Sequence, residues 1–337
     1  MFKNDRFAIV DQRSLDREAV DRQGPLNLSL VIPVYNEVAA ISVFTERVLS
    51  LFSQDPSICV EFLFVNDGST DGTLDLLLEL QSADSRFKII DLSRNFGKEA
   101  ALSAGLDAAI GRAVIPIDVD LQDPPELIFE MASLWRQGYD VVLARRIDRS
   151  ADSQFKRVSA GWFYGVLSKI SDVYLPENVG DFRLMDRSVI NALKTLPESK
   201  RFMKGLFAWV GFRTTVVDYS RSERSSGETK FNGWRLWNFA LEGITSFSTD
   251  PLRIWTYLGF SVSLISFSFG VVIALRVLLY GVDTPGYASL IVAVTFFGGL
   301  QLIGIGILGE YLGRTYIEAK RRPVYLIRRT YESKSRD

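Results

Sequence analysis

Two aspartates spaced by one residue follow an apolar stretch near the middle of the chain. Residues 113–117 read Ala-Val-Ile-Pro-Ile, and Asp118, Asp120 and Gln122 come directly after them. On an extended chain these three oxygen-bearing side chains share one face. Carboxylate and amide oxygens suit Mg²⁺ or Mn²⁺, whose remaining ligands are usually water and substrate phosphate. The pattern predicts a metal site; an acidic turn that caps the next helix is the alternative.

An acid and a base spaced by one residue recur later in the chain. Asp181 and Arg183 lie in the segment Gly-Asp-Phe-Arg-Leu and would share a face if that segment is extended. The carboxylate could act on a nucleophile, and the guanidinium could bind the phosphate group to which that nucleophile belongs. A structural ion pair is the alternative reading.

Basic side chains in polar stretches could contact the phosphates of a substrate, although solvated charged loops explain them as well. This set comprises Arg145, Arg157, Arg224 and Lys230.

The first half of the chain alternates apolar stretches, typical of buried strands, with stretches of helical periodicity. Strands are expected over residues 28–35, 61–66, 87–92, 113–117 and 140–144, and helices over 41–52, 74–80, 99–110 and 126–137. Such alternation with short loops predicts an α/β fold with a mostly parallel sheet covered on both faces. Ligands of such sheets bind at the carboxyl ends of the strands, which is where Asp67 and Asp118 fall.

Composition excludes several classes of protein. The 337 residues include no histidine, which removes Ser-His-Asp catalysis and His-ligated metal sites. A net charge of −1 gives no basic field for nucleic acid. The chain has neither a G-x-G-x-x-G fingerprint nor a P-loop, so a dehydrogenase or kinase is disfavoured. The single cysteine, Cys59, lies in an apolar run and is expected to be buried.

The last third of the chain contains two uncharged, apolar stretches. Residues 254–275 and 287–309 are each long enough to cross a bilayer, which requires ~20 residues. Basic residues crowd the chain after the second stretch, which places the catalytic domain and both termini in the cytoplasm of a multi-pass inner-membrane protein. A helical hairpin buried in a globular fold is the alternative.

We therefore expect five parts along the chain. They are a charged arm over 1–25, a catalytic domain over 26–231, an interfacial amphipathic helix over 232–250, a transmembrane hairpin over 251–313 and a basic tail over 314–337.

Four motifs precede the apolar hairpin. They are Val-Ile-Pro-Val-Tyr-Asn-Glu at 31–37, Val-Asn-Asp-Gly-Ser-Thr-Asp-Gly-Thr at 65–73, Ser-Arg-Asn-Phe-Gly-Lys-Glu-Ala-Ala at 93–101 and Asp-Val-Asp-Leu-Gln-Asp-Pro-Pro at 118–125. In this order they resemble family 2 glycosyltransferases of the GT-A fold, a Rossmann-like α/β architecture. Within that family the chain is most similar to polyprenyl-phosphate glycosyltransferases related to dolichyl-phosphate mannose synthase, especially those that glucosylate bactoprenol (undecaprenyl phosphate).

The resemblance implies roles for particular residues, all named by their positions in this chain. Substrate contacts are implied for Pro33, Tyr35, Glu37, Asp67, Asp118, Arg145, Arg157, Arg183 and Arg224, and we expect them also for Lys98 and Lys230. The expected catalytic residues are Asp181, Asp120 and Arg183. The implied metal ligands, for Mg²⁺ or Mn²⁺, are Asp118, Asp120 and Gln122. Asp181 matches an acidic position near the acceptor, where it would act as a base or position the acceptor.

The activity implied is inverting transfer of a hexose, glucose from UDP-glucose, to undecaprenyl phosphate for O-antigen or other cell-surface glycan modification. Implied partners are the membrane, the lipid acceptor, further copies of the chain and a flippase, with no nucleic acid. One alternative is the same chemistry with a mannose or aminosugar donor. Another is a non-catalytic, membrane-anchored nucleotide-sugar-binding partner of a flippase.

Overall fold

The computed structural model describes residues 22, 24–147, 179–196, 198, 201, 203–220, 250–280 and 286–332. The chain divides into two compact units. The first comprises Met1–Tyr164, Tyr174–Phe231 and Pro323–Asp337, and the second comprises Gly165–Val173 and Asn232–Arg322. The end of the chain therefore belongs to the same unit as its first half.

The first unit is organised around one sheet, whose strand order in the described residues is β7-β5-β6-β4-β1-β2-β3-β8. In chain order the strands are β1 (Leu26–Val34), β2 (Ile58–Asn66), β3 (Phe87–Leu92), β4 (Ala113–Pro116), β5 (Val141–Arg146), β6 (Val179–Asp186), β7 (Thr214–Tyr219) and β8 (Ile327–Tyr331). Strands β4, β1, β2 and β3 are parallel neighbours. Strand β6 is antiparallel to β4 and β5, β7 is parallel to β5, and β8 is antiparallel to β3. The predicted mostly parallel α/β sheet is confirmed.

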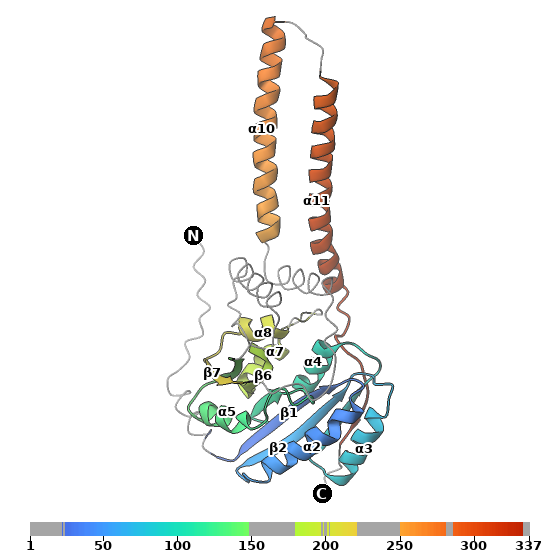
Figure 1. The fold of residues 1–337 in the computed structure, drawn as a ribbon, viewed down its shortest axis with the longest axis vertical. Coiled ribbons are helices and arrows are strands. Elements are labelled where there is room, and N and C mark those ends of the chain that lie inside the picture. Colours follow the sequence, from blue (N-terminus) through green and yellow to red (C-terminus); the bar gives the residue numbers. More distant parts are fainter. Residues whose placement is uncertain are drawn as a thin grey trace. The chain divides into compact units, whose positions relative to one another are not determined.

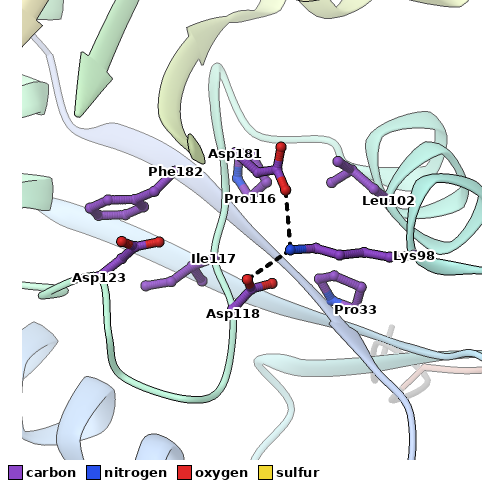
Figure 2. A pocket seen from close by; sticks show the side chains of 9 residues that line it. All are labelled: Pro33, Lys98, Leu102, Pro116, Ile117, Asp118, Asp123, Asp181 and Phe182. Carbon is purple, nitrogen blue, oxygen red and sulfur yellow. Dashed lines mark hydrogen bonds and ion pairs between the residues drawn. The ribbon is translucent and has the colours of Figure 1, made fainter. Parts of the chain in front are cut away.

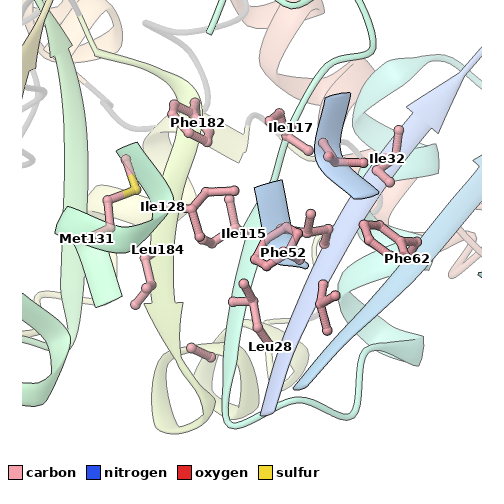
Figure 3. Close-up of a cluster of buried hydrophobic side chains, with 14 of the residues drawn as sticks. Leu28, Ile32, Phe52, Phe62, Ile115, Ile117, Ile128, Met131, Phe182 and Leu184 are labelled. Atoms are coloured by element: carbon pink, nitrogen blue, oxygen red, sulfur yellow. The ribbon is translucent and has the colours of Figure 1, made fainter. Parts of the chain in front are cut away.

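Helices cover both faces of this sheet (Figure 1). Side chains of α2 (Val38–Phe52), α3 (Thr73–Ala83) and α5 (Leu127–Arg136) join one apolar cluster with alternate residues of the central strands. Within it the ring of Phe52 lies 6.1 Å from that of Phe62 (Figure 3). Because side chains of a strand alternate between its faces, the residues between those of the cluster face the other helices.

That second face is covered by α4 (Lys98–Ala108) and α7 (Arg187–Lys194), with α8 (Met203–Trp209) beside Ser103 of α4. Helix α4 lies very close to the sheet, since a Cβ on Gly105 would be 2.2 Å from Val31 of β1 and 3.1 Å from Val65 of β2. This close packing fixes the position of α4, and with it the residues at its amino end.

The sequence-based expectations match the first half of the chain closely, and the extended segment around Asp181 is strand β6. Strands β7 and β8 and helix α7 were not predicted. The expectation for Cys59 was wrong. It is exposed because at the start of β2 only Ile58 and Val60 face the core. Arg22 of the expected arm is buried, where it pairs with Asp140 at 2.8 Å.

The second unit contains two long helices, α10 (Asp250–Tyr280) and α11 (Tyr287–Ala319). They touch where Trp255 lies against Gly304, at which a Cβ would be 2.0 Å from the indole Nε1. Within the described residues one stretch, Phe296–Ala319, is long and apolar enough to cross a membrane. Apart from its last residue, the expected interfacial helix lies outside the described residues.

Candidate active site

A pocket lies where the strand order changes direction. Along the chain β1 is followed by β2 and β3 on one side, while β4 lies on the other side of β1. Parallel sheets bind ligands at such switch points, at the carboxyl ends of the strands. Here Pro33 of β1 and Pro116 of β4 form part of the wall (Figure 2). The full lining comprises Pro33, Lys98, Leu102, Pro116, Ile117, Asp118, Asp123, Asp181 and Phe182.

Lys98 joins two carboxylates in this pocket. Its ammonium lies 2.7 Å from Asp118 Oδ2 and 3.1 Å from Asp181 Oδ2 (Figure 2). Lys98 is the first residue of α4, whereas Asp118 follows β4. Burial opposes the charge on Lys98, but the two carboxylates outweigh it and raise the pKa of Lys98. The pocket therefore contains a cation held between two acids.

The strand pairing explains how Asp181 reaches Asp118. Strand β6 runs antiparallel to β4, with Ala113 opposite Asp186 and Val114 opposite Met185. The amino end of β6, which carries Asp181, therefore lies at the carboxyl end of β4. Burial favours a raised pKa for Asp181, but Lys98 and Lys204 outweigh it and hold the pKa below its usual value. The carboxylate is ionised at neutral pH, and its buried Oδ1 has no hydrogen-bond partner among the described residues.

Arg183, two residues along β6, is almost completely buried. Its Nη2 donates to the carbonyl of Gly180 at 2.6 Å, and its guanidinium lies 4.3 Å from the ring centre of Phe207. Its Nε is buried and has no hydrogen-bond partner in the part of the chain that the structure describes. Burial lowers the pKa of Arg183 to about 10, so it remains charged at neutral pH. Unpaired groups on both Asp181 and Arg183 leave this strand able to bind a polar ligand.

Glu99 was not singled out from the sequence. Its Oε2 accepts a hydrogen bond from the backbone N–H of Met203 at 3.2 Å. Burial, then the charge of Asp181, raises the pKa of Glu99 to about 7. One feature of the sequence could have indicated Glu99. It is an acidic residue directly after Lys98, in a helix whose following residues are mostly small or apolar.

Asp67 holds the loop that precedes α4. Its two carboxylate oxygens accept hydrogen bonds from the backbone N–H groups of Phe96 at 2.7 Å and Gly97 at 2.9 Å. The adjoining Gly68 has φ +65°, and a Cβ there would lie 2.4 Å from the carbonyl carbon of Arg94. Only glycine permits both this backbone conformation and this approach. Burial raises the pKa of Asp67.

The first two loops are joined by hydrogen bonds. Asn36 donates from its backbone N–H to Ser69 Oγ, and its side-chain oxygen accepts from the N–H of Thr70. The neighbouring Tyr35 is 45% exposed and is not part of the pocket lining. The pKa of Glu37 is raised, mainly by burial and then by the negative charges of Asp120 and Asp118.

The proposed metal ligands lie in the turn after β4. The backbone N–H of Gln122 donates to Asp120 Oδ1 at 3.1 Å, and Leu121 between them has φ 52°. The Gln122 side chain is buried. Among the described residues no three acidic, histidine or cysteine side chains are grouped closely enough to bind a metal by themselves. An oxygen-only donor set of this kind fits Mg²⁺ or Mn²⁺ when substrate phosphates supply further ligands.

The remaining predicted residues are less closely tied to the pocket. Arg145 forms a two-point ion pair with Asp218 of β7, at 2.7 and 2.9 Å, and is not part of the pocket lining. Asp123, which does line the pocket, accepts a hydrogen bond from the hydroxyl of Tyr219. Arg157, Arg224 and Lys230 lie outside the described residues.

The chain is similar to known proteins along nearly all of its length. The prophage bactoprenol glucosyl transferase homolog of Escherichia coli is 53% identical over 304 residues, which cover 90% of this chain and 99% of that protein. The bactoprenol glucosyl transferase of Shigella phage SfV is 54% identical over 303 residues, covering 90% and 98%.

A solved structure of the mannosyltransferase from Pyrobaculum calidifontis, in complex with GDP-Man and Mn²⁺, matches with a TM-score of 0.45. That match is 16% identical and covers 91% of this chain and 94% of the other. A family model described as glycosyl transferase family 2 matches residues 29–194, which include most of β1, all of β2 to β6 and every residue of the pocket lining. With relatives more than half identical over almost their whole length, the chain belongs to glycosyl transferase family 2.

Proposed function

We propose that this protein transfers glucose from UDP-glucose to undecaprenyl phosphate, with inversion at the anomeric carbon. The observation that carries the proposal is the pocket in which Lys98 joins Asp118 and Asp181, in a chain 53–54% identical to proteins named for bactoprenol glucosyl transfer. Donor and acceptor would meet there, with the nucleotide on the side of Asp118 and the acceptor phosphate on the side of Asp181.

On the donor side, the loops after β1, β2 and β4 would bind the nucleotide. Pro33 lines the pocket, and Tyr35, two residues further along the chain, is exposed. Asp67 would act by holding the loop at Phe96 and Gly97 in place, since both of its oxygens already accept hydrogen bonds from that loop. Asp118, Asp120 and Gln122 would hold Mg²⁺ or Mn²⁺ against the diphosphate, where the ion would neutralise the leaving group.

On the acceptor side, Asp181 would position the acceptor instead of removing a proton. A phosphate monoester has a second pKa near ~6, so at neutral pH the acceptor is already largely a dianion and needs no strong base. Asp181 itself has a lowered pKa and pairs with Lys98, which makes it a weak base. Lys98 and Arg183 would attract the phosphate, and the attacking oxygen would approach the sugar from the face opposite the leaving diphosphate.

The second unit would anchor the enzyme beside its lipid acceptor. Large apolar side chains of α10 and α11 are exposed along both helices, for example Phe260 at 69% and Leu302 at 70%. Soluble proteins rarely expose apolar surface over such a length, whereas lipid covers it in a membrane. We therefore propose a two-helix transmembrane hairpin with a cytoplasmic catalytic unit. Association with further copies of the chain and with a flippase remain predictions.

The test supplies purified protein in detergent with undecaprenyl phosphate, Mg²⁺ or Mn²⁺, and a panel of radiolabelled UDP- and GDP-sugars. We expect label in the lipid phase from UDP-glucose, and none when EDTA is present. Label transferred from a different donor would keep the proposed mechanism but change the sugar that is transferred. Binding of a nucleotide sugar without transfer from any donor would contradict the proposal and favour a non-catalytic binding role.

A further inference from the structure

The segment that follows α11 contacts the carboxyl end of α4 and the loop that precedes α4. The hydroxyl of Tyr325 donates to Asp107 Oδ2 at 2.8 Å, near the carboxyl end of α4. At the other end, the backbone N–H of Ser93 donates to the carbonyl of Leu326 at 2.9 Å. Ser93 opens the loop that leads into Lys98. We call residues 325–331, which include strand β8, the C-terminal clasp.

A bulge in β8 directs one arginine onto the same loop. In the pairing of β3 with β8, Asp91 lies opposite Arg329 and Leu92 lies opposite Ile327, so Arg328 is the extra residue. Bulges of this kind redirect a side chain and are common next to active sites. The Arg328 guanidinium donates to the carbonyl of Ser93 at 2.7 Å and lies 3.5 Å from Asp91 Oδ2.

The partner of Arg328 is itself part of the network beneath the active-site loops. Asp91 is buried, and its other oxygen accepts from the side chain of Asn66 at 2.8 Å. Asn66 in turn accepts from the backbone N–H of Ser69, in the loop after β2. A buried carboxylate needs such partners, because an unpaired charge there would be costly. Arg328 therefore supports the loops after β2 and β3 together.

We propose that the C-terminal clasp, through Arg328, positions the loop over residues 93–97 and so places Lys98 between the two carboxylates of the pocket. The loop is held at its start by Arg328 and Leu326 and near its end by Asp67. Lys98 follows immediately. Arg328 is on this view a positioning residue for sugar transfer, although it lies outside the pocket lining; the inference rests on the proposed function.

The first experiment compares Arg328→Ala with Arg329→Ala in the full-length, detergent-purified protein. Arg329 is a matched control, because it is the next residue of β8 and lies 5.0 Å from the ring of Tyr331, the last residue of that strand. We expect Arg328→Ala to lower kcat/KM by about tenfold and Arg329→Ala by less than about twofold. Arg328→Lys should recover part of the loss, since an ammonium can reach one of the two acceptors but not both.

A double-mutant cycle tests whether Arg328 acts through Lys98. In a Lys98→Met background, Arg328→Ala should cost less than about twofold, because the side chain that it positions is already gone. Equal losses in both backgrounds would overturn the inference, as would wild-type kcat/KM in Arg328→Ala.

Hydrogen exchange separates failure of the inference from failure of the proposed function. In Arg328→Ala, amide exchange of Phe96 and Gly97 should become faster, and in Arg329→Ala it should not. If the wild-type protein transfers no sugar but the exchange difference is present, the proposed function fails and the positioning role stands. If the wild-type protein is active and exchange is unchanged in Arg328→Ala, the clasp does not position the loop.

Discussion

The parallel and antiparallel parts of the sheet contribute to the pocket by different kinds of interaction. In the parallel part, from β4 to β3, loops at the carboxyl ends are joined by hydrogen bonds to backbone N–H groups, as at Asp67 and Asn36. The antiparallel neighbours contribute through ion pairs, with Asp181 of β6 on Lys98 and Arg328 of β8 on Asp91.

The hydrogen bonds of the parallel part determine the shape of the pocket, whereas the ion pairs from the antiparallel strands determine much of its charge. Hydrogen bonds between backbone and uncharged side chains, as at Asn36, fix the loop geometry and change little with pH or salt, whereas those at Asp67 also depend on its carboxylate being ionised. Charge pairs respond to both, because screening weakens them and titration removes them. Substitutions in the parallel part should therefore change binding geometry or folding, whereas substitutions on the antiparallel side should change the pH dependence.

The largest effect is expected for Asp120→Asn, in the turn after β4. The loss of a carboxylate ligand leaves the leaving diphosphate less well neutralised, and kcat should fall by roughly 10²–10³-fold or more. Lipid-phase transfer of labelled glucose measures it, with an unchanged unfolding midpoint as the control. Near-normal turnover would remove Asp120 from the metal site.

The second prediction concerns Lys98, which links Asp118 after the parallel strand β4 to Asp181 of the antiparallel strand β6. Lys98→Met removes the cation between Asp118 and Asp181, and activity should fall by roughly 10²-fold. Burial would then act on Asp181 with less opposition and raise its pKa, so the acidic limb of the pH–rate profile should shift to higher pH. The profile of kcat/KM against pH measures this shift.

Lys88→Met is the matched control for that experiment. Lys88 pairs with Glu61 at 2.8 Å, on strands β3 and β2, and is not part of the pocket lining. Its loss should leave the pH profile as in the wild-type protein. If both lysine variants shift the profile alike, the effect comes from net charge and not from the bridge.

The same division explains how much could be predicted from the sequence. Strands β1 to β5 and the helices between them follow from local periodicity, and the acids Asp67 and Asp118 fall at strand ends that such a pattern locates. The pairing of β6 with β4 could not be predicted from spacing, because the partners are far apart in the chain and run in opposite directions. Asp181 was therefore found by its residue type, but its bridge to Lys98 was not.

Strand β8 is the clearest case of what local pattern leaves out. Residues 327–331 read Ile-Arg-Arg-Thr-Tyr, a short edge strand with exposed charges, and the sequence reading placed them in a basic tail. Their structure depends on β3 as a partner, and no periodicity within five residues indicates it. Glu99 was missed for a related reason, since its raised pKa depends on burial and on Asp181 of another strand.

The third prediction concerns folding of the parallel part. Gly68→Ala combines an unfavourable positive φ with a steric clash against the backbone of Arg94, and should lower the free energy of unfolding by about 2–3 kcal/mol. Gly211→Ala is the control, because its φ of +68° is equally strained but the nearest atom to the added Cβ, the carbonyl oxygen of Trp209, lies at an ordinary contact distance of 3.8 Å. It should cost only about 1 kcal/mol. Equal losses would mean that the close approach of the two loops does not matter for stability.

The smallest effect is expected for Glu99→Gln, in α4, where the charge of Asp181 on the antiparallel strand β6 acts on the Glu99 carboxyl. The folded state raises the pKa of Glu99 from 4.5 to about 7, so between these pH values the folded protein binds more protons than the unfolded chain. Stability from this group is therefore complete below pH 4.5 and is lost as pH rises through 7, by about 1 kcal/mol after allowance for solvent screening. Glutamine cannot ionise, so unfolding midpoints between pH 5 and 8 should fall less steeply in Glu99→Gln.

Glu79→Gln, an exposed change on α3, should keep the wild-type slope. If Glu99→Gln and the wild-type protein lose stability in parallel, Glu99 ionises normally, and the charge of Asp181 does not reach it.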